Sequence, residues 1–80
     1  MAVSILFLGP LRDLAGMEAC EVEAPLDWEG LLNRVGGQVA EQLSNDRVNV
    51  ACAGRVLADK TTLAAKDGDE VALLPPVSGG

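Results

Sequence analysis

One stretch of the sequence, WEGLLNRV, has the strongest helical pattern, and it limits the fold more than any other feature. Trp28, Leu31, Leu32 and Val35 recur at spacings of three and four residues, so they share one face of a helix. Asp27 comes directly before them and is a good N-cap, because its carboxylate can accept hydrogen bonds from the first backbone amides. The sequence therefore predicts a single main helix that needs one apolar surface to pack against.

The other apolar segments are short or alternate with polar residues, as β-strands do. We predict strands over residues 3–8, 18–24, 48–53, 56–57 and 70–74, a short helix over 11–15, and one or two further helical turns over 38–44. Residues 25–27 should lead directly into the main helix, Gly36-Gly37 should end or kink it, and residues 59–66 should form a loop. This order predicts an α+β domain with one main helix packed on one face of a sheet.

Length and charge limit the partners of this domain. Eighty residues make one domain, and the net charge of −6 comes with only six scattered basic residues. Phe7 and Trp28 are the only aromatic residues, so we expect no nucleic-acid partner. No apolar stretch approaches the roughly 20 residues that span a membrane, so we expect no membrane partner and a cytoplasmic location. The acidic charge suits docking on a basic protein surface, or simply keeps the domain soluble.

The side chains offer little chemistry. The sequence has no histidine, and Cys20 and Cys52 are the only thiols, at a spacing that fits no local metal motif. We expect both to be small core residues. Asp67, Asp69 and Glu70 could bind a cation weakly, but a tight turn explains them better. We therefore predict no metal site and no cofactor bound directly by this chain.

The sequence ends in LPPVSGG, and this ending is the candidate functional element. The α-carboxylate of Gly80 has a usual pKa of about 3.3–3.7, so it is ionised and must be activated, for example as an acyl-adenylate made from ATP, before it can react. Gly79 and Gly80 lack Cβ atoms and could enter a narrow channel. Pro75-Pro76 should stiffen the base, and residues 76–80 could extend roughly 16 Å. The alternative is a frayed, inert end.

The face of the sheet opposite the main helix should carry a second candidate element. Alternation along the first strand puts Leu6 and Leu8 on this side. In the last strand Leu74 points the same way, directly before Pro75. If these residues cluster, they form a docking patch; if not, they are ordinary surface leucines.

Three segments resemble the small subunit of molybdopterin synthase, a ubiquitin-like, β-grasp sulfur carrier. They are the turn and strand DGDEV (67–71), the ending LPPVSGG (74–80) and the early segment FLGPLRDLAG (7–16). The resemblance extends over the whole chain, and the Pro-Pro and Gly-Gly ending is its most specific part. It implies a β-grasp domain over residues 1–76, with a mixed sheet of four to five strands, and a flexible Gly-Gly tail over residues 77–80.

The resemblance also implies a mechanism and the residues that carry it. An ATP-dependent activating enzyme would adenylate Gly80 and convert it to a thiocarboxylate, and the tail residues Gly79, Ser78 and Val77 would carry its sulfur into the large catalytic subunit of the synthase. There the sulfur would be donated to a pterin precursor, in an assembly of two large and two small subunits. Partner-binding residues are expected on the open side of the sheet and at the base of the tail: Leu6, Leu8, Leu74, Pro75 and Pro76. The chain would be a non-catalytic, sulfur-donating subunit.

Three other functions stay open at this point. The chain could carry sulfur for thiamin or another thio-metabolite, although such relatives usually lack the Pro-Pro-Val ending. It could be a ubiquitin-like modifier attached to lysines. It could also be a plain interaction domain with an inert tail.

Overall fold

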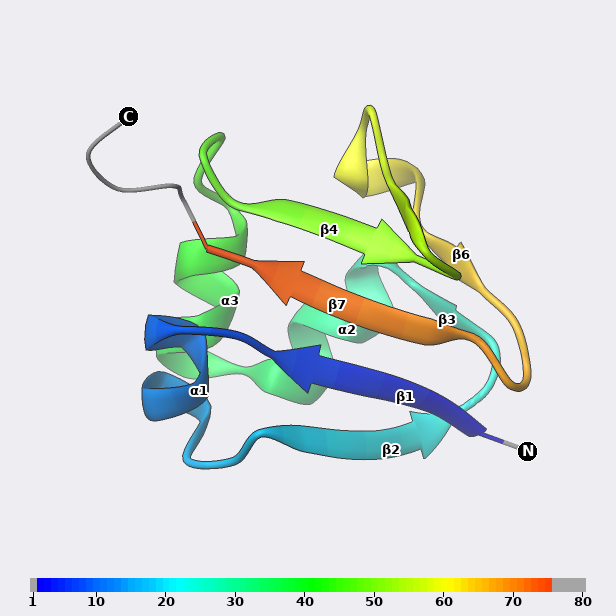
Figure 1. Ribbon diagram of the computed structural model, residues 1–80, viewed down its shortest axis with the longest axis horizontal. Coiled ribbons are helices and arrows are strands. Elements are labelled where there is room, and N and C mark those ends of the chain that lie inside the picture. Colours follow the sequence, from blue (N-terminus) through cyan, green and yellow to red (C-terminus); the bar gives the residue numbers. More distant parts are fainter. Residues whose placement is uncertain (1, 76–80) are drawn as a thin grey trace.

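Five strands form one mixed sheet in the computed structural model, which describes residues 2–75 and leaves Met1 and residues 76–80 outside the described part. In spatial order they are β2 (Ala19–Glu23), β1 (Ala2–Phe7), β7 (Glu70–Leu74), β4 (Asn49–Cys52) and β5 (Arg55–Val56). The central strands β1 and β7 run parallel, and the other neighbours are antiparallel. The last strand of the chain therefore lies in the middle of the sheet (Figure 1).

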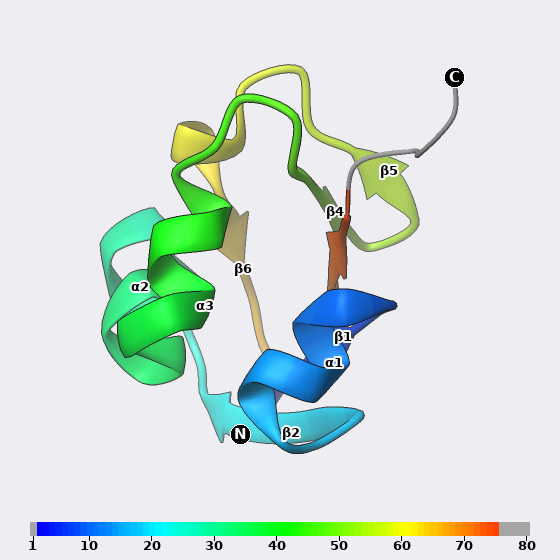
Figure 2. The same ribbon diagram turned by 90° about the vertical axis from the view of Figure 1, so that its left-hand side faces the viewer.

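The helices lie on one side of this sheet. They are α1 (Pro10–Ala15), α2 (Trp28–Val35) and α3 (Gly37–Leu43). Figure 2 shows the sheet nearly edge-on, with α2 and α3 on one side and β5 on the other. The predicted α+β layering is thus confirmed, and the sheet has one covered and one uncovered face.

The helical region follows the prediction that Gly36-Gly37 ends the main helix and that further helical turns come after it. Residues 37–43 form a separate helix, α3, because Gly36 and Gly37 both have positive φ angles, 57° and 45°, which break the continuous turn. The predicted cap is confirmed, since the Asp27 Oδ1 atom accepts a hydrogen bond from the Gly30 amide at 2.7 Å. The predicted break and the predicted turns over 38–44 are thus confirmed, with α3 beginning and ending one residue earlier.

A second, two-stranded sheet was not predicted. Leu26–Asp27 forms β3, which pairs antiparallel with β6 (Ala64–Ala65) before α2 begins. Residues 59–66 are therefore not a simple loop; they contain a 3-10 turn, η1 (Lys60–Thr62), followed by β6. Asp59 holds this turn by accepting a hydrogen bond from the Thr61 amide at 3.0 Å. Leu63 is buried and anchors the segment in the core.

Strand ends also move by one residue at most. β1 stops at Phe7, and the Leu8 carbonyl accepts a hydrogen bond from the Leu11 amide at 3.2 Å, so Leu8 already belongs to the approach to α1. The β4–β5 hairpin turns at Ala53 and Gly54, with φ angles of 52° and 83°. Two positive values in a two-residue loop are typical of a type I′ turn, which explains why Ala53 needs a glycine beside it.

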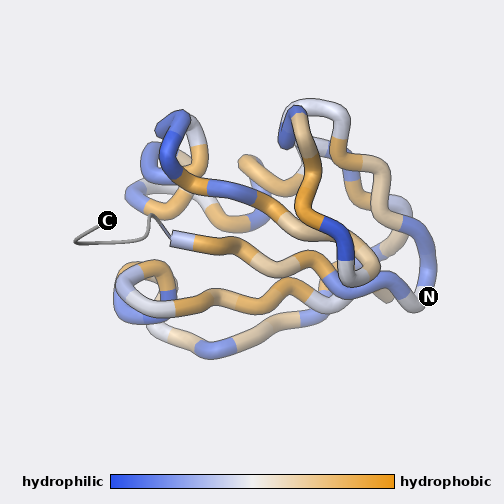
Figure 3. The backbone as a smooth tube through the Cα atoms, turned by 45° about the horizontal axis from the view of Figure 1, so that its top comes forward, coloured by the Kyte–Doolittle hydropathy of each residue, from blue (hydrophilic) through white to orange (hydrophobic). Residues whose placement is uncertain are grey.

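Strand alternation puts the core where the sequence predicts it. Val3, Ile5 and Phe7 of β1 are buried beneath the helices, as are Val71 and Leu73 of β7. The whole buried cluster is Val3, Ile5, Phe7, Leu11, Leu26, Leu31, Val39, Leu43, Val48, Val50, Leu63, Ala65, Val71 and Leu73. Figure 3 shows β1 and β7 as hydrophobic over most of their length. The neighbours Leu6, Ala72 and Leu74 are only partly buried, which leaves them for the uncovered face.

Candidate functional site

The uncovered side of the sheet, which we call the open face, carries an apolar row that crosses all five strands. Register pairs Leu6 with Ala19 and Ala72, Ala72 with Ala51, and Ala51 with Val56. Paired residues point to the same side of a sheet. Leu6 is half-buried and Val56 is 61% exposed, so this row is a flat surface without a helix over it.

The described chain leaves this sheet at Leu74 and Pro75. Leu73 pairs with Phe7, and a Cβ atom added to Gly9 would lie 3.1 Å from the Pro75 Cγ atom, so Pro75 packs closely on the segment after β1. Leu74 and Leu8 lie between these two contacts, at the same edge of the sheet. We call this end of the sheet, where both β1 and β7 finish, the exit edge. It brings apolar side chains from β1 and β7 to the point where residue 76 follows.

The predicted partner-binding and tail residues fall into two groups, four that the structure describes and five that lie outside the described residues. Leu6, Leu74 and Pro75 are half-buried at the open face or the exit edge, and Leu8 is 40% exposed beside them. Leu6 and Leu8 together line a shallow hollow of about 300 Å³ with Ala19. The structure thus brings these four residues together. Pro76, Val77, Ser78, Gly79 and Gly80 lie outside the described residues, so the sulfur-bearing end itself remains a prediction.

Sequence reasoning missed the alanines and the valine of the open face. Ala19, Ala51, Ala72 and Val56 are unremarkable in the sequence, and only the strand register joins them to Leu6. The alternation of apolar residues within β4 and β7 indicated two apolar sides. The order of the strands was the missing information.

A second hollow lies against the exit edge on the helical side. It measures about 460 Å³ and is lined by Pro10, Leu11, Asp13, Leu14, Gln42 and Pro75. Leu14 is 40% exposed there. Apolar surface thus continues from the open face around Pro75 towards α1 and α3.

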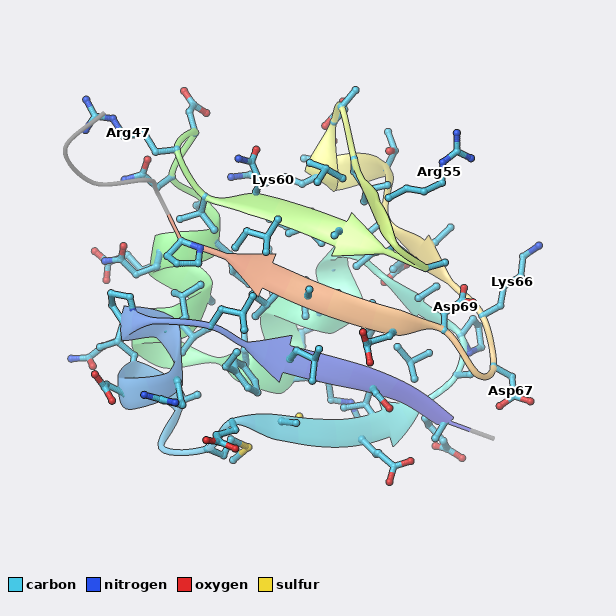
Figure 4. The ribbon with its side chains drawn as sticks, viewed as in Figure 1. Arg47, Arg55, Lys60, Lys66, Asp67 and Asp69 are labelled. Carbon is cyan, nitrogen blue, oxygen red and sulfur yellow. The ribbon has the colours of Figure 1, made fainter. Side chains whose placement is uncertain are left out.

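The acidic turn before β7 has a structural role. The Asp67 Oδ1 atom accepts a hydrogen bond from the Ala2 amide at 3.0 Å, and the Asp69 Oδ2 atom accepts one from the Lys66 amide at 2.9 Å. Figure 4 shows Lys66, Asp67 and Asp69 together in this turn. No group of histidine, cysteine and carboxylate side chains within residues 2–75 could hold a metal ion. In the same range no helix is long and apolar enough to cross a membrane.

Both cysteines are free and half-buried. Burial raises the pKa of the Cys20 thiol. The pKa of the Cys52 thiol is raised mainly by burial and further by the negative charge of Asp69, whose Oδ2 atom lies 4.0 Å from the sulfur. The unfolded chain loses its thiol protons at a lower pH than the folded chain does. The stability that the two neutral, half-buried thiols contribute is therefore lost as pH rises above about 8.5. Near neutral pH both thiols are protonated and poor nucleophiles.

The charge of Asp69 can be tested through the reactivity of Cys52. Asp69→Asn is expected to lower the Cys52 pKa and to raise its alkylation rate at pH 8 by about twofold or more, because the thiolate is the reactive form. Peptide mass spectrometry after timed iodoacetamide treatment measures this rate. Cys20 in the same sample is the control, since Asp69 does not affect its pKa. An equal acceleration at both thiols would indicate loosening of the fold instead.

Comparison with known proteins gives this architecture a family. The sequence matches the ThiS family over residues 5–80. No match was found among curated protein sequences. SAMP1 from Haloferax volcanii is 27% identical, with 100% of each chain covered and a TM-score of 0.75. A chain in the complex of subunits 1 and 2 of molybdopterin-converting factor from Helicobacter pylori 26695 is 28% identical, with 100% of each chain covered and a TM-score of 0.66.

A third structure supports the fold alone. The small archaeal modifier protein 1 from Methanosarcina acetivorans is 20% identical over 99% of this chain and 96% of its own, with a TM-score of 0.74. The mixed five-stranded sheet with helices on one face is the ubiquitin-like β-grasp that the resemblance implied. With a family match over nearly its whole length and structural neighbours of the same architecture, this chain belongs to the ThiS family of ubiquitin-like sulfur carriers.

Proposed function

We propose that this chain carries sulfur for molybdenum cofactor biosynthesis as the small subunit of molybdopterin synthase. The observation that carries the proposal is the arrangement at the exit edge. The central strand β7 ends in Leu74 and Pro75 beside the apolar open face, and the sequence continues from there to Gly79-Gly80. A partner that docks on the open face would thus receive the residues that follow Pro75. The similarity to a chain from a complex of subunits 1 and 2 of molybdopterin-converting factor supports such a partner.

The chemistry takes place at the Gly80 carboxylate. An activating enzyme joins it to the α-phosphate of ATP and releases pyrophosphate, because the free carboxylate is a poor electrophile. A sulfide-level sulfur nucleophile then attacks the carbonyl carbon; the new C–S bond replaces the C–O bond to phosphate, and AMP leaves. In the large subunit the thiocarboxylate sulfur attacks a carbon of the pterin precursor, and the new C–S bond replaces a C–O bond of that carbon, whose oxygen leaves with the electron pair. Water then cleaves the resulting thioester, so that sulfur stays on the pterin and the carboxylate is regenerated.

The rest of the domain is suited to a carrier rather than to a catalyst. Within residues 2–75 no metal-binding group is present, and the two thiols have raised pKa values. Protonated thiols would not attack the activated carboxylate at neutral pH. The domain therefore contributes a reactive group and a docking surface, and the partners contribute the catalytic groups.

Direct binding tests the choice of pathway. Isothermal titration of the purified chain with the large subunit of molybdopterin synthase from the same organism is expected to show a 1:1 complex, and titration with a thiazole-forming enzyme is expected to show none. Leu6→Glu, which places a charge in the apolar row, should abolish binding without unfolding the domain. Binding to the thiazole-forming enzyme alone would assign the chain to thiamin synthesis.

A second function is favoured by one observation, the similarity to SAMP1. A protein modifier would form an amide bond between its activated terminus and lysines of other proteins. Affinity purification from cell extracts, followed by digestion and mass spectrometry, would then find Gly-Gly remnants on many lysines. A dedicated sulfur carrier should leave almost none.

A further inference from the structure

The open face is divided into an apolar part and an acidic part. The apolar row through Leu6 lies nearer the exit edge, and two residues further along the strands the row is Glu21, Ser4 and Glu70. Glu23 follows on β2, paired with Ala2. Glu21, Glu23 and Glu70 are all exposed. The surface therefore changes from uncharged to negative within one step along the sheet.

Glu21 and Glu70 stand on either side of a shallow hollow. It measures about 350 Å³ and is lined by Ser4, Leu6, Ala19, Cys20, Glu21 and Glu70. Ser4 pairs with both glutamates, so it lies between them at the centre of the row. Since neighbouring strands are about 4.8 Å apart, the Cα atoms of the two glutamates are separated by roughly 10 Å. Two carboxylates can thus approach one group in the hollow, with apolar side chains at its other end.

Within residues 2–75, neither Glu21 nor Glu70 forms a salt bridge. The one ion pair within residues 2–75 joins Arg12 to Glu18 at 3.4 Å. In Figure 4, Arg47, Lys60 and Arg55 lie beyond β4, and Lys66 lies at the turn before β7. The Lys60 ammonium group also donates hydrogen bonds to the carbonyls of Val48, at 2.8 Å, and Asn45. In the free protein, water solvates the two glutamates.

Docking changes this balance. A protein that covers the apolar row also removes water from the hollow, because Leu6 and Ala19 belong to both. An unpaired carboxylate loses its hydration at a large cost unless an opposite charge replaces the water. A purely apolar docking surface would therefore be disfavoured at this end of the open face. A surface with a cation at the matching position would be favoured, and the net charge of −6 would draw it in.

We propose that the hollow between Glu21 and Glu70 receives a basic side chain, an arginine by its geometry, from the large synthase subunit. The inference rests on the proposed function and specifies the surface chemistry of that partner. The aliphatic stem would lie on Leu6 and Ala19, while the guanidinium group has enough donors for both carboxylates and the Ser4 hydroxyl. This contact fixes the rotation of the domain on its partner, and so the direction in which the residues after Pro75 enter.

Paired charge-neutralising variants test this contact. Glu21→Gln/Glu70→Gln removes two charges from the hollow, and Glu29→Gln/Glu41→Gln removes two exposed charges from α2 and α3 on the covered side. Both change the net charge equally. We expect the first pair to weaken binding to the large subunit about tenfold or more in 150 mM salt, mostly through faster dissociation, and the second pair to change it less than about threefold. Titration calorimetry and stopped-flow binding measure both effects, and circular dichroism checks the fold.

The outcomes separate the inference from the function on which it rests. If the unmodified chain binds the large subunit and both double variants bind equally well, the basic contact is wrong and the proposed function stands. Equal weakening by both pairs would reduce the effect to net charge and also overturn the contact. If the unmodified chain does not bind the large subunit, the proposed function fails and the contact with it. A dimer of the free chain in sedimentation equilibrium, lost only in Glu21→Gln/Glu70→Gln, would assign the hollow to a second copy.

Discussion

Replacing Leu73 with alanine is expected to lower the free energy of unfolding by about 2–5 kcal/mol, the usual cost of emptying a leucine site in a packed core. Leu73 is fully buried on the central strand β7, and it pairs with Phe7 and Val50 across its two neighbours. Small domains have total stabilities of about 5–15 kcal/mol, so this one change removes a large share. Urea unfolding followed by circular dichroism measures the difference.

Leu74 is the matched control on the opposite side of the same strand. It is only half-buried, so Leu74→Ala should cost about 1 kcal/mol or less in stability. Because it lies at the exit edge, the same change is expected to weaken binding to the large synthase subunit about tenfold or more. Leu73→Ala should therefore mainly lower the free energy of unfolding, whereas Leu74→Ala should mainly weaken binding to the large subunit. Equal destabilisation by both would mean that the open face is not a free surface.

The second large effect concerns the tail. Deleting Gly79-Gly80, or adding one residue after Gly80, should reduce sulfur delivery to the level seen without the protein, because the carboxylate is then missing or displaced from the activating site. Conversion of the pterin precursor in a mixture of large subunit, activating enzyme, ATP and sulfide measures delivery. Thermal unfolding should be unchanged, since the altered residues lie after the last strand.

Two further observations make this result specific. Ser78→Ala keeps the length of the tail and its Gly-Gly end, so it should retain most of the delivery. The deletion variant should still bind the large subunit through the open face, although more weakly. Full sulfur delivery by the deletion variant would show that another group carries the sulfur.

Local patterns predicted most of the fold. Alternation in residues 3–8 and 70–74 gave the correct core side of both central strands, and the Asp27 cap with the Trp28–Val35 pattern placed α2 to the residue. These features depend on residues close in sequence, so a single sequence contains the information. Leu6 and Leu74 are half-buried and Leu8 is exposed, and their role in binding a partner stays a prediction.

The missed features all depend on contacts between distant residues. Leu26–Asp27 becomes a strand only because Ala64–Ala65 pairs with it, and two residues are too few to show alternation. Lys60 reaches the carbonyls of the α3–β4 connection and lies 5.9 Å from the centre of the Trp28 ring, which no spacing in the sequence indicates. The hollow between Glu21 and Glu70 likewise needs the order β2-β1-β7, since these glutamates are 49 positions apart in the sequence.

Intact mass tests the central claim most directly: that the working group of this protein is the carboxylate of Gly80. The purified chain is incubated with ATP, sulfide and the activating enzyme, and then weighed by mass spectrometry. Replacement of one oxygen by sulfur adds about 16 Da to the chain. We predict this gain for the natural sequence and none for a variant extended beyond Gly80. An unchanged mass, with an enzyme that thiolates its own known carrier in the same buffer, would contradict the account.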